Sequence, residues 1–208
     1  MTESMRIPGG SIALTPMQSW MFYESVPAER AWVNLQQAVL RLDREAISLE
    51  ALQSAWNSVA ALHPALRASI RWRKLEKPLQ VVADAVDVVV EELDWQDRPA
   101  ETQDTALEDF LTRDRHRGVD VEAVPHWRVS LIRLAPTRSV MIWTVHNALI
   151  DGTSVGIVLE DLFAVLDTGA PLSARLTNEA YLGMCQTIGA PADPSAKPYF
   201  ADYLEGFE

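Results

Sequence analysis

Apolar and polar residues recur along this chain with two different spacings, which separate expected helices from expected strands. Apolar residues three or four positions apart are typical of amphipathic helices. Helices are predicted over residues 48–62, 101–115, 153–166, 176–188 and, as a short last element, 197–206. Thr15 followed by Pro16 predicts the start of one more short helix, because threonine can cap free N–H groups and proline suits the first helical position.

Segments rich in apolar and β-branched residues predict the strands. They are residues 32–42, 65–72, 127–134 and 139–146, with two short strands and a turn inside 81–93. The turn at 135–138 joins its two neighbouring strands as a hairpin. Strands and helices alternate irregularly, which predicts an α/β sandwich with helices packed on a mixed sheet rather than a regular doubly wound sheet.

Composition narrows the class of protein further. The 208 residues are 48% apolar and 23% charged, and 18 Lys and Arg against 29 Asp and Glu give a net charge of −11. Nucleic acids and anionic membranes both bind basic surfaces, so the acidic balance argues against both as partners. Residues 1–12 lack the basic start and apolar run of a signal peptide, and no window approaches ~20 uninterrupted apolar residues. We therefore expect a cytoplasmic protein.

Metal and cofactor chemistry has little support in the sequence. The single cysteine, Cys185, excludes an internal disulfide, and four scattered histidines with one cysteine match no structural zinc spacing. The nine glycines form no G-x-G-x-x-G or G-K-[ST] phosphate loop. We expect no metal and no covalently bound cofactor.

One stretch is a candidate site, because a predicted strand ends there at a histidine and a helix follows an Asp-Gly pair. Residues 144–154 read T-V-H-N-A-L-I-D-G-T-S. This stretch resembles the H-H-x-x-x-D-G motif of the chloramphenicol acetyltransferase-like superfamily, which includes the condensation and epimerisation domains of nonribosomal peptide synthetases. Residues 14–18, 62–67, 125–129 and 156–162 resemble further family motifs in the same order. The resemblance runs from about residue 12 to 175 and implies a single acetyltransferase-like lobe.

The register of the motif matters for the chemistry. The resemblance places Asn147 where the family has its catalytic histidine and His146 at the first, structural histidine position. An amide side chain does not titrate near neutral pH, whereas imidazole does. Neighbouring residues on a strand point to opposite faces, so we expect His146 to point into the layer behind the site. His146 as the catalyst is the alternative, and it needs a twist at the strand end.

The resemblance also assigns roles to residues around the loop. It implies an ion pair between Asp151 and Arg67, while the alternative is two unrelated surface charges. Gly152 is predicted to permit a tight turn. Ser154 is predicted to be a capping residue rather than a nucleophile.

Other histidines and tryptophans have simpler expected roles. His63 is expected to bind carbonyl groups at a helix end, and His126 is expected to be half-buried. His116 lies in the basic run 113–117, which predicts a solvated face; the alternative is a contact with an acidic carrier protein or its phosphopantetheine phosphate. Tryptophans on apolar stripes are expected in the core. These are Trp20, Trp56, Trp72, Trp127 and Trp143.

Domain organisation follows from the resemblance, because condensation domains consist of two facing lobes. Residues 1–12 are interpreted as a tail, 13–190 as the first lobe, and 191–208 as a linker with the start of a second lobe or a C-terminal helix. A lobe without its partner exposes an apolar cleft face, which favours self-association or docking to a neighbour.

Three functions remain open at this point. The first is a condensation-like domain that lacks ordinary peptide-bond formation and serves as a structural or docking module for a carrier protein or an adenylation domain. The second is a divergent enzyme that transfers or tailors acyl groups on the phosphopantetheine arm of a carrier, completed by a second lobe or subunit. The third is a free-standing trimeric acetyltransferase that uses a coenzyme A thioester.

Overall fold

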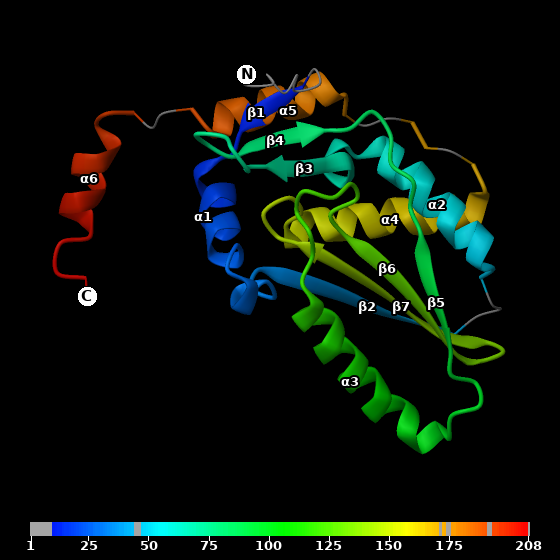
Figure 1. Ribbon diagram of the computed structural model, residues 1–208. Helices are drawn as coiled ribbons and strands as arrows, with labels where there is room; N and C mark the ends of the chain where they lie inside the picture. The colour runs from blue at the N-terminus through cyan, green and yellow to red at the C-terminus, as the bar shows by residue number, and fades with distance from the viewer. Residues whose placement is uncertain (1–9, 44–46, 171, 174–175, 191–192, 208) are drawn as a thin grey trace.

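Two β-sheets and the helices around them make up the computed structural model, which describes residues 10–43, 47–170, 172–173, 176–190 and 193–207 (Figure 1). The helices are α1 (Pro16–Ser25), α2 (Leu49–Leu62), α3 (Ala100–Arg117), α4 (Gly152–Thr168), α5 (Asn178–Ile188) and α6 (Ala196–Tyr203), with short 3-10 turns at Ala28–Arg30 and Pro64–Arg67. The strands are β1 (Ser11–Ala13), β2 (Leu35–Asp43), β3 (Ala68–Arg71), β4 (Leu79–Val82), β5 (Val90–Asp94), β6 (Arg128–Ala135) and β7 (Arg138–His146).

Side-chain caps fix where several helices begin. Thr15 and Gln18 form a reciprocal capping box at the start of α1, with Pro16 in the first turn. Ser48 accepts a hydrogen bond from the Ala51 N–H at the start of α2. These two predicted helix starts are confirmed, since each cap satisfies N–H groups that have no partner within the helix.

The larger sheet is mixed, as the sequence predicts. Its order is β2-β7-β6-β5, in which β6 and β7 form the predicted antiparallel hairpin and β5 runs parallel to β6. Helices α2 and α4 pack on one face, and α3 packs on the other, where its Leu107 joins Trp95 and residues of β6 and β7. The sheet is therefore the middle layer of a sandwich (Figure 1).

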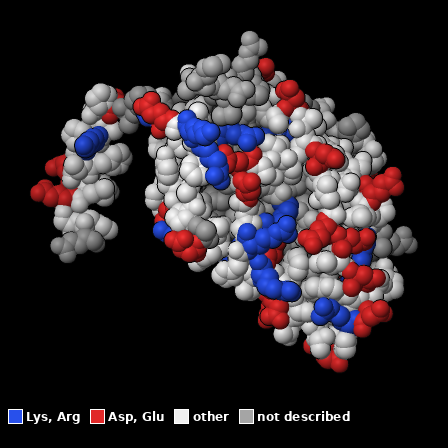
Figure 2. All heavy atoms as spheres, viewed as in Figure 1, with Lys and Arg blue, Asp and Glu red and all other residues white. Residues whose placement is uncertain are grey.

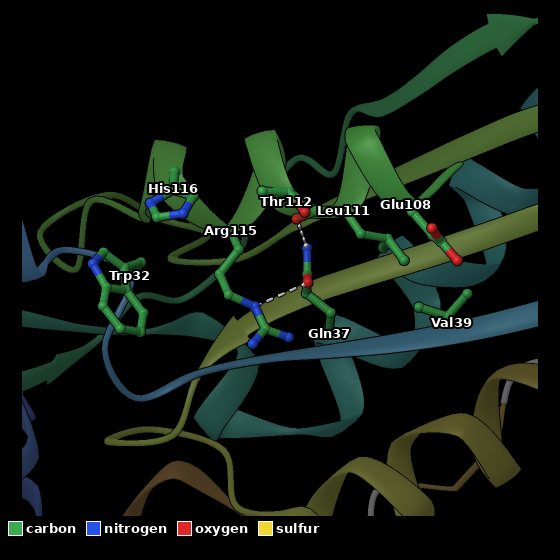
Figure 3. Close-up of a pocket in the computed structure, with 8 residues that line it drawn as sticks. All are labelled: Trp32, Gln37, Val39, Glu108, Leu111, Thr112, Arg115 and His116. Carbon is green, nitrogen blue, oxygen red and sulfur yellow. Dashed lines mark hydrogen bonds between the residues drawn. The ribbon is translucent and has the colours of Figure 1, made fainter. Parts of the chain in front are cut away.

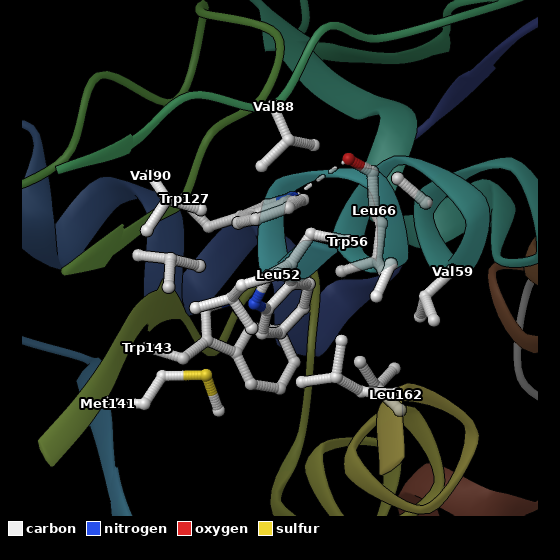
Figure 4. Close-up of a cluster of buried hydrophobic side chains, with 14 of the residues drawn as sticks. Leu52, Trp56, Val59, Leu66, Val88, Val90, Trp127, Met141, Trp143 and Leu162 are labelled. Carbon is white, nitrogen blue, oxygen red and sulfur yellow. Dashed lines mark hydrogen bonds between the residues drawn. The ribbon is translucent and has the colours of Figure 1, made fainter. Parts of the chain in front are cut away.

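Three tryptophans form the centre of the core between the larger sheet and α2 and α4 (Figure 4). The Trp56 ring lies 5.1 Å from that of Trp127 and 5.0 Å from that of Trp143, measured between centroids. Trp127 donates its indole N–H to the Leu66 carbonyl at 2.9 Å. The predicted core positions of these three residues are confirmed.

A second, three-stranded sheet is a feature that the sequence pattern does not predict. Its antiparallel order is β1-β4-β3, so the two strands expected within 81–93 belong to different sheets. Ser11 and Ile12, in the segment interpreted as a tail, already pair with β4. The segment 65–72 also differs from expectation, because it begins with the 3-10 turn Pro64–Arg67 before entering β3.

Two helices expose large apolar side chains. On α1, the side chains of Met17, Trp20 and Tyr23 are 60%, 57% and 58% exposed, so the core position predicted for Trp20 is wrong. Helix α6 stands apart from the rest of the molecule and has no buried residue (Figure 1). Positions three residues apart share a helix face, so α1 presents an apolar stripe to its surroundings.

Candidate functional site

The loop from His146 to Gly152 connects the central strand β7 to helix α4, and its backbone is firmly held. Asn147 donates its backbone N–H to the Asn34 carbonyl at 2.8 Å. The N–H groups of Leu149 and Ile150 both bond the His146 carbonyl, and their side chains are buried. Asn34 has a φ of 61°, a left-handed conformation that asparagine tolerates better than most residues.

His146 is buried and both of its ring nitrogens are engaged. Nε2 lies 2.8 Å from Ser25 Oγ, and Nδ1 accepts the Ala148 backbone N–H at 3.1 Å. Ser25 donates its own hydroxyl proton to the carbonyls of Met21 and Phe22, each 3.0 Å away. The network therefore assigns the imidazole proton to Nε2, which donates to Ser25.

Burial sets the acid–base behaviour of His146. It lowers the pKa of the imidazole from 6.5 to about 4, because the charged form would lose its hydration. The lone pair of Nδ1 is occupied by the Ala148 N–H, so it is not free to take a proton from a substrate. The Ser25–His146 pair resembles a nucleophile–base pair in distance alone, since such a base needs a free lone pair at the nitrogen nearest the hydroxyl. The prediction that His146 points into a buried layer is confirmed.

Asn147 is half-buried at the end of the strand. Its Oδ1 atom is buried and has no hydrogen-bond partner among the described residues. A buried acceptor without a partner costs free energy, so this side chain is held in an unfavourable polar environment. The side chain can orient an N–H group, but it cannot remove a proton at neutral pH.

The ion pair predicted between Arg67 and Asp151 is wrong. The Arg67 guanidinium is buried and donates to the carbonyls of Ala60, at 3.0 Å, and Ala83, and to Asn178 Oδ1 at 2.9 Å. Burial lowers the pKa of this guanidinium from 12.5. Arg67 does not pair with Asp151 because the C-terminal end of α2 offers carbonyl groups without helical partners, and the guanidinium lies where it donates to them.

Asp151 instead caps helix α4. Its Oδ1 accepts the Ser154 backbone N–H at 2.8 Å, and hydrogen bonds from Ser154 lower the pKa of the Asp151 carboxyl. The capping role predicted for Ser154 thus belongs to Asp151. Gly152 is the first residue of α4, and a Cβ atom there would meet no atom within 4 Å. The tight turn expected at Gly152 does not require glycine.

Two histidines outside the loop differ from their predicted roles. His63 bonds Asp161 of α4 through Nε2 at 2.8 Å, rather than helix carbonyls. His126 is fully buried rather than half-buried, and its Nδ1 lies 2.9 Å from the Ala68 carbonyl. The basic run is partly internal too, because Asp114 within it is buried against Arg128 at 2.5 Å. His116 is exposed, as predicted.

Comparison with known proteins decides which family this chain belongs to. The family model for the condensation domain matches residues 9–183. The chain belongs to the condensation-domain family. One of the linear gramicidin synthase proteins of Brevibacillus parabrevis is 36% identical over 199 residues, covering 93% of this chain. Bacitracin synthase 1 from Bacillus licheniformis is 25% identical over 197 residues, covering 94% of this chain.

Solved condensation domains share the fold. The first condensation domain of the calcium-dependent antibiotic synthetase superposes with a TM-score of 0.78 at 17% identity, over 95% of this chain and 48% of that one. The starter condensation domain of rhizomide synthetase gives a TM-score of 0.78 at 13% identity, with the same two coverages. The condensation-domain chain thus spans about half of these solved domains, and 4% of the linear gramicidin and bacitracin synthases.

Sequence reasoning missed the residues that hold the condensation-domain loop in place. Ser25 contacts His146 from 121 positions away, and Asn34 holds the Asn147 backbone across the strand pair β2–β7. Within the described ranges, no group of three or more His, Cys, Asp or Glu residues is placed to hold a metal ion. Nor is any described helix long and apolar enough to cross a membrane.

Proposed function

We propose that this condensation-domain chain does not form peptide bonds by the ordinary route and serves as a docking module in a nonribosomal peptide synthetase, for a carrier protein or an adenylation domain. The observation that carries the proposal is the pair at the end of β7. Asn147 stands at the position that the family resemblance gives to the catalytic histidine, and His146 has both ring nitrogens occupied. Neither side chain offers a free basic nitrogen to a substrate.

The missing base has a large kinetic consequence. General acid–base assistance contributes about 10²–10⁴ in rate, so a site without it retains only what positioning supplies. Asn147 can still accept an N–H group of a substrate once its buried, unpaired oxygen turns outward. That capacity suits holding an amine in place and does not replace proton transfer.

The docking role is supported by the apolar stripe on α1. The side chains of Met17, Trp20 and Tyr23 on this helix are each more than half exposed. Exposed apolar stripes of this kind mark interaction sites. The net charge of −11 disfavours a broad contact with an acidic carrier protein. A local contact at Arg113–Arg117 or at the α1 stripe fits better, with the phosphopantetheine arm of the carrier as the group presented. The same stripe can also join two copies of the chain.

A divergent acyl-transferring or tailoring enzyme, of condensation or epimerisation type, is the second candidate. It is favoured by one observation, namely that the chain spans 48% of the solved condensation domains. A second lobe or another protein chain would then complete the site and supply the missing base beside Asn147.

A carrier-based assay separates these functions. The chain is incubated with donor and acceptor carrier proteins that bear aminoacyl thioesters, and products are followed by intact-protein mass spectrometry. We expect peptide-bond formation no faster than the low rate that positioning alone supplies, and binding of a carrier or adenylation domain that Trp20→Ala weakens. Peptide formation that Asn147→Ala abolishes would contradict the proposal. A mass change other than condensation would support the second candidate.

A further inference from the structure

A hollow of about 550 Å³ lies between helix α3 and strand β2 (Figure 3). β2 is the end strand of the larger sheet, and α3 leaves part of its outward-facing side uncovered. The volume falls in the range of about 300–1,000 Å³ that is usual for small-molecule sites. The hollow shares no residue with the loop 146–152, so it is a separate site.

Arg115 supplies the cationic group of this hollow. Its Nε donates to Gln37 Oε1 at 3.2 Å, while its two terminal nitrogens have no acceptor among the described residues. The side chain is exposed, and His116 stands beside it in the last turn of α3. Figure 2 shows a group of Lys and Arg side chains over this end of α3, on a face that carries many acidic side chains. An anion therefore has a local partner on an otherwise acidic molecule.

A buried network holds Arg115 in position. Gln37 donates through Nε2 to Asp114 Oδ2 at 2.7 Å, which turns its Oε1 toward Arg115. Asp114 in turn accepts from Thr144 at 2.6 Å and from Arg128 at 2.5 Å. The guanidinium is thus oriented before any ligand arrives, which lowers the entropic cost of binding.

Trp32 forms an apolar wall at the same end. Its indole N–H donates to the Glu29 carbonyl at 3.1 Å, so the ring is held although 42% of the residue is exposed. The ring centroid lies 5.8 Å from that of His116. Val39, which is 41% exposed, and Leu111 continue the apolar lining along the hollow. An exposed, immobilised indole is suited to contact with an apolar side chain.

Glu108 closes the opposite end of the hollow. It lies seven residues before Arg115 on the same helix, which separates the two Cα atoms by about 10 Å along the axis. Figure 3 shows Glu108 and Val39 at the end away from Trp32 and His116. The hollow therefore has a cationic end that also carries Trp32 and an anionic end that also carries Val39, with Leu111 between them.

We propose that this hollow binds a short apolar peptide with free termini. Its carboxylate lies on Arg115 and His116, an apolar side chain packs on Trp32, and its amino group faces Glu108. An extended tripeptide spans about 10 Å, which matches the separation of the two charged ends. This site shares no residue with the loop 146–152, although its Arg115 and His116 belong to the Arg113–Arg117 run that is one candidate contact for a carrier protein.

The test is a titration of the full chain with the tripeptide leucyl-leucyl-phenylalanine, followed by isothermal calorimetry. Arg115→Gln removes the guanidinium, and Arg113→Gln on the same helix is the matched control, because Arg113 does not line the hollow. We expect Arg115→Gln to weaken binding about tenfold, the size of one charge-assisted hydrogen bond. Arg113→Gln should leave the affinity unchanged.

Two modified peptides make the assignment sharper. The C-terminal amide should bind the wild-type chain as weakly as the free acid binds Arg115→Gln, and Arg115→Gln should no longer distinguish acid from amide. The N-acetyl peptide should lose affinity for the wild-type chain but not for Glu108→Gln. The proposal is overturned by equal wild-type affinity for acid and amide, by equal losses in Arg115→Gln and Arg113→Gln, or by no saturable binding of the free tripeptide.

Discussion

The two faces of the larger sheet differ in how much polar chemistry they bury. Alternate residues of β7 point to opposite sides, so Trp143 and Val145 meet α2 and α4 while Thr144 and His146 face the other way. The first face is a packed apolar core, and the second combines a smaller apolar cluster around Trp95 and Leu107 with a buried carboxylate, Asp114, and its hydrogen-bond partners. The first face supplies stability mainly by apolar packing, and the hydrogen bonds of the second fix how α3 and the surface hollow lie.

The polar face is the one that connects to both sites of interest. Asp114 links Arg128 to Gln37, and through Gln37 to Arg115 in the hollow beside α3. His146 ends the same side of β7 and begins the candidate loop. Because hydrogen bonds are directional and packing is not, this face is expected to control geometry at the surface, while the tryptophan face controls overall stability.

The largest expected effect is on the tryptophan face. Trp56 is fully buried and contacts two other indole rings, so Trp56→Ala is expected to lower the free energy of unfolding by about 5 kcal/mol. Chemical denaturation followed by circular dichroism measures this change. Trp20→Ala is the matched control, because Trp20 is 57% exposed and its loss should leave unfolding nearly unchanged. Equal effects of the two substitutions would contradict the assignment of the core.

The next effect is on the polar face. Asp114→Ala leaves Arg128, whose side chain is 18% exposed, without its carboxylate and is expected to cost about 3–4 kcal/mol. Burial by itself raises the pKa of Asp114, but hydrogen bonds from Arg128 and Thr144 lower it overall. A carboxyl with a lowered folded-state pKa stabilises the native state above its unfolded pKa and loses that contribution as pH falls toward the folded value.

The same denaturation experiment, repeated between pH 5 and pH 2, checks this sign. Wild-type stability should fall with acidification below about pH 4, the ordinary aspartate pKa. Asp114→Asn should start from a lower stability and show a shallower fall in that window. An equally steep acid dependence in Asp114→Asn would show that Asp114 is not bound as its contacts indicate.

The buried His146 on the polar face makes the free energy of unfolding depend on pH in a second range. The His146 pKa is lowered by burial from 6.5 to about 4, so the unfolded chain takes up the proton first as pH falls. Stability is therefore expected to decrease between pH 6.5 and pH 4, by up to about 3 kcal/mol at pH 4 from this group. His146→Gln should remove about half of the fall in this window, because buried His126, whose pKa is lowered to about 3, supplies the rest, and the exposed His116→Gln should leave the fall unchanged. A flat wild-type curve would contradict the burial of His146.

Much of the tryptophan face could be predicted from sequence because its signals are local. Apolar spacing and the cap at Ser48 defined α2, and the turn at 135–138 defined the β6–β7 hairpin. The small sheet could not be predicted in the same way. It joins β1 to β4 across nearly seventy positions, and its strands of three or four residues carry almost no periodic signal of their own.

In the candidate site too, features with local sequence signals could be predicted and features that depend on tertiary packing could not. The loop was located by its motif, and the burial of His146 followed from strand alternation. Arg67 and Asp151 were paired by resemblance alone, and the pair failed because each side chain satisfies backbone groups nearer to it. The Ser25–His146 contact and the Asp114 network depend on tertiary packing over long sequence separations, which residue spacing does not encode.

The smallest expected effect separates a buried ion pair from an exposed one between the same two layers. Arg41 of β2 and Asp104 of α3 lie 3.0 Å apart, close to the Arg128–Asp114 distance of 2.5 Å. Their side chains are 59% and 76% exposed, so water and salt screen the attraction. Asp104→Ala is therefore expected to change the free energy of unfolding by less than about 0.5 kcal/mol, measured by urea denaturation at low and high salt. A loss approaching that of Asp114→Ala would mean that the charges themselves hold α3 on the sheet. A loss confined to Asp114→Ala would place that role in the buried network.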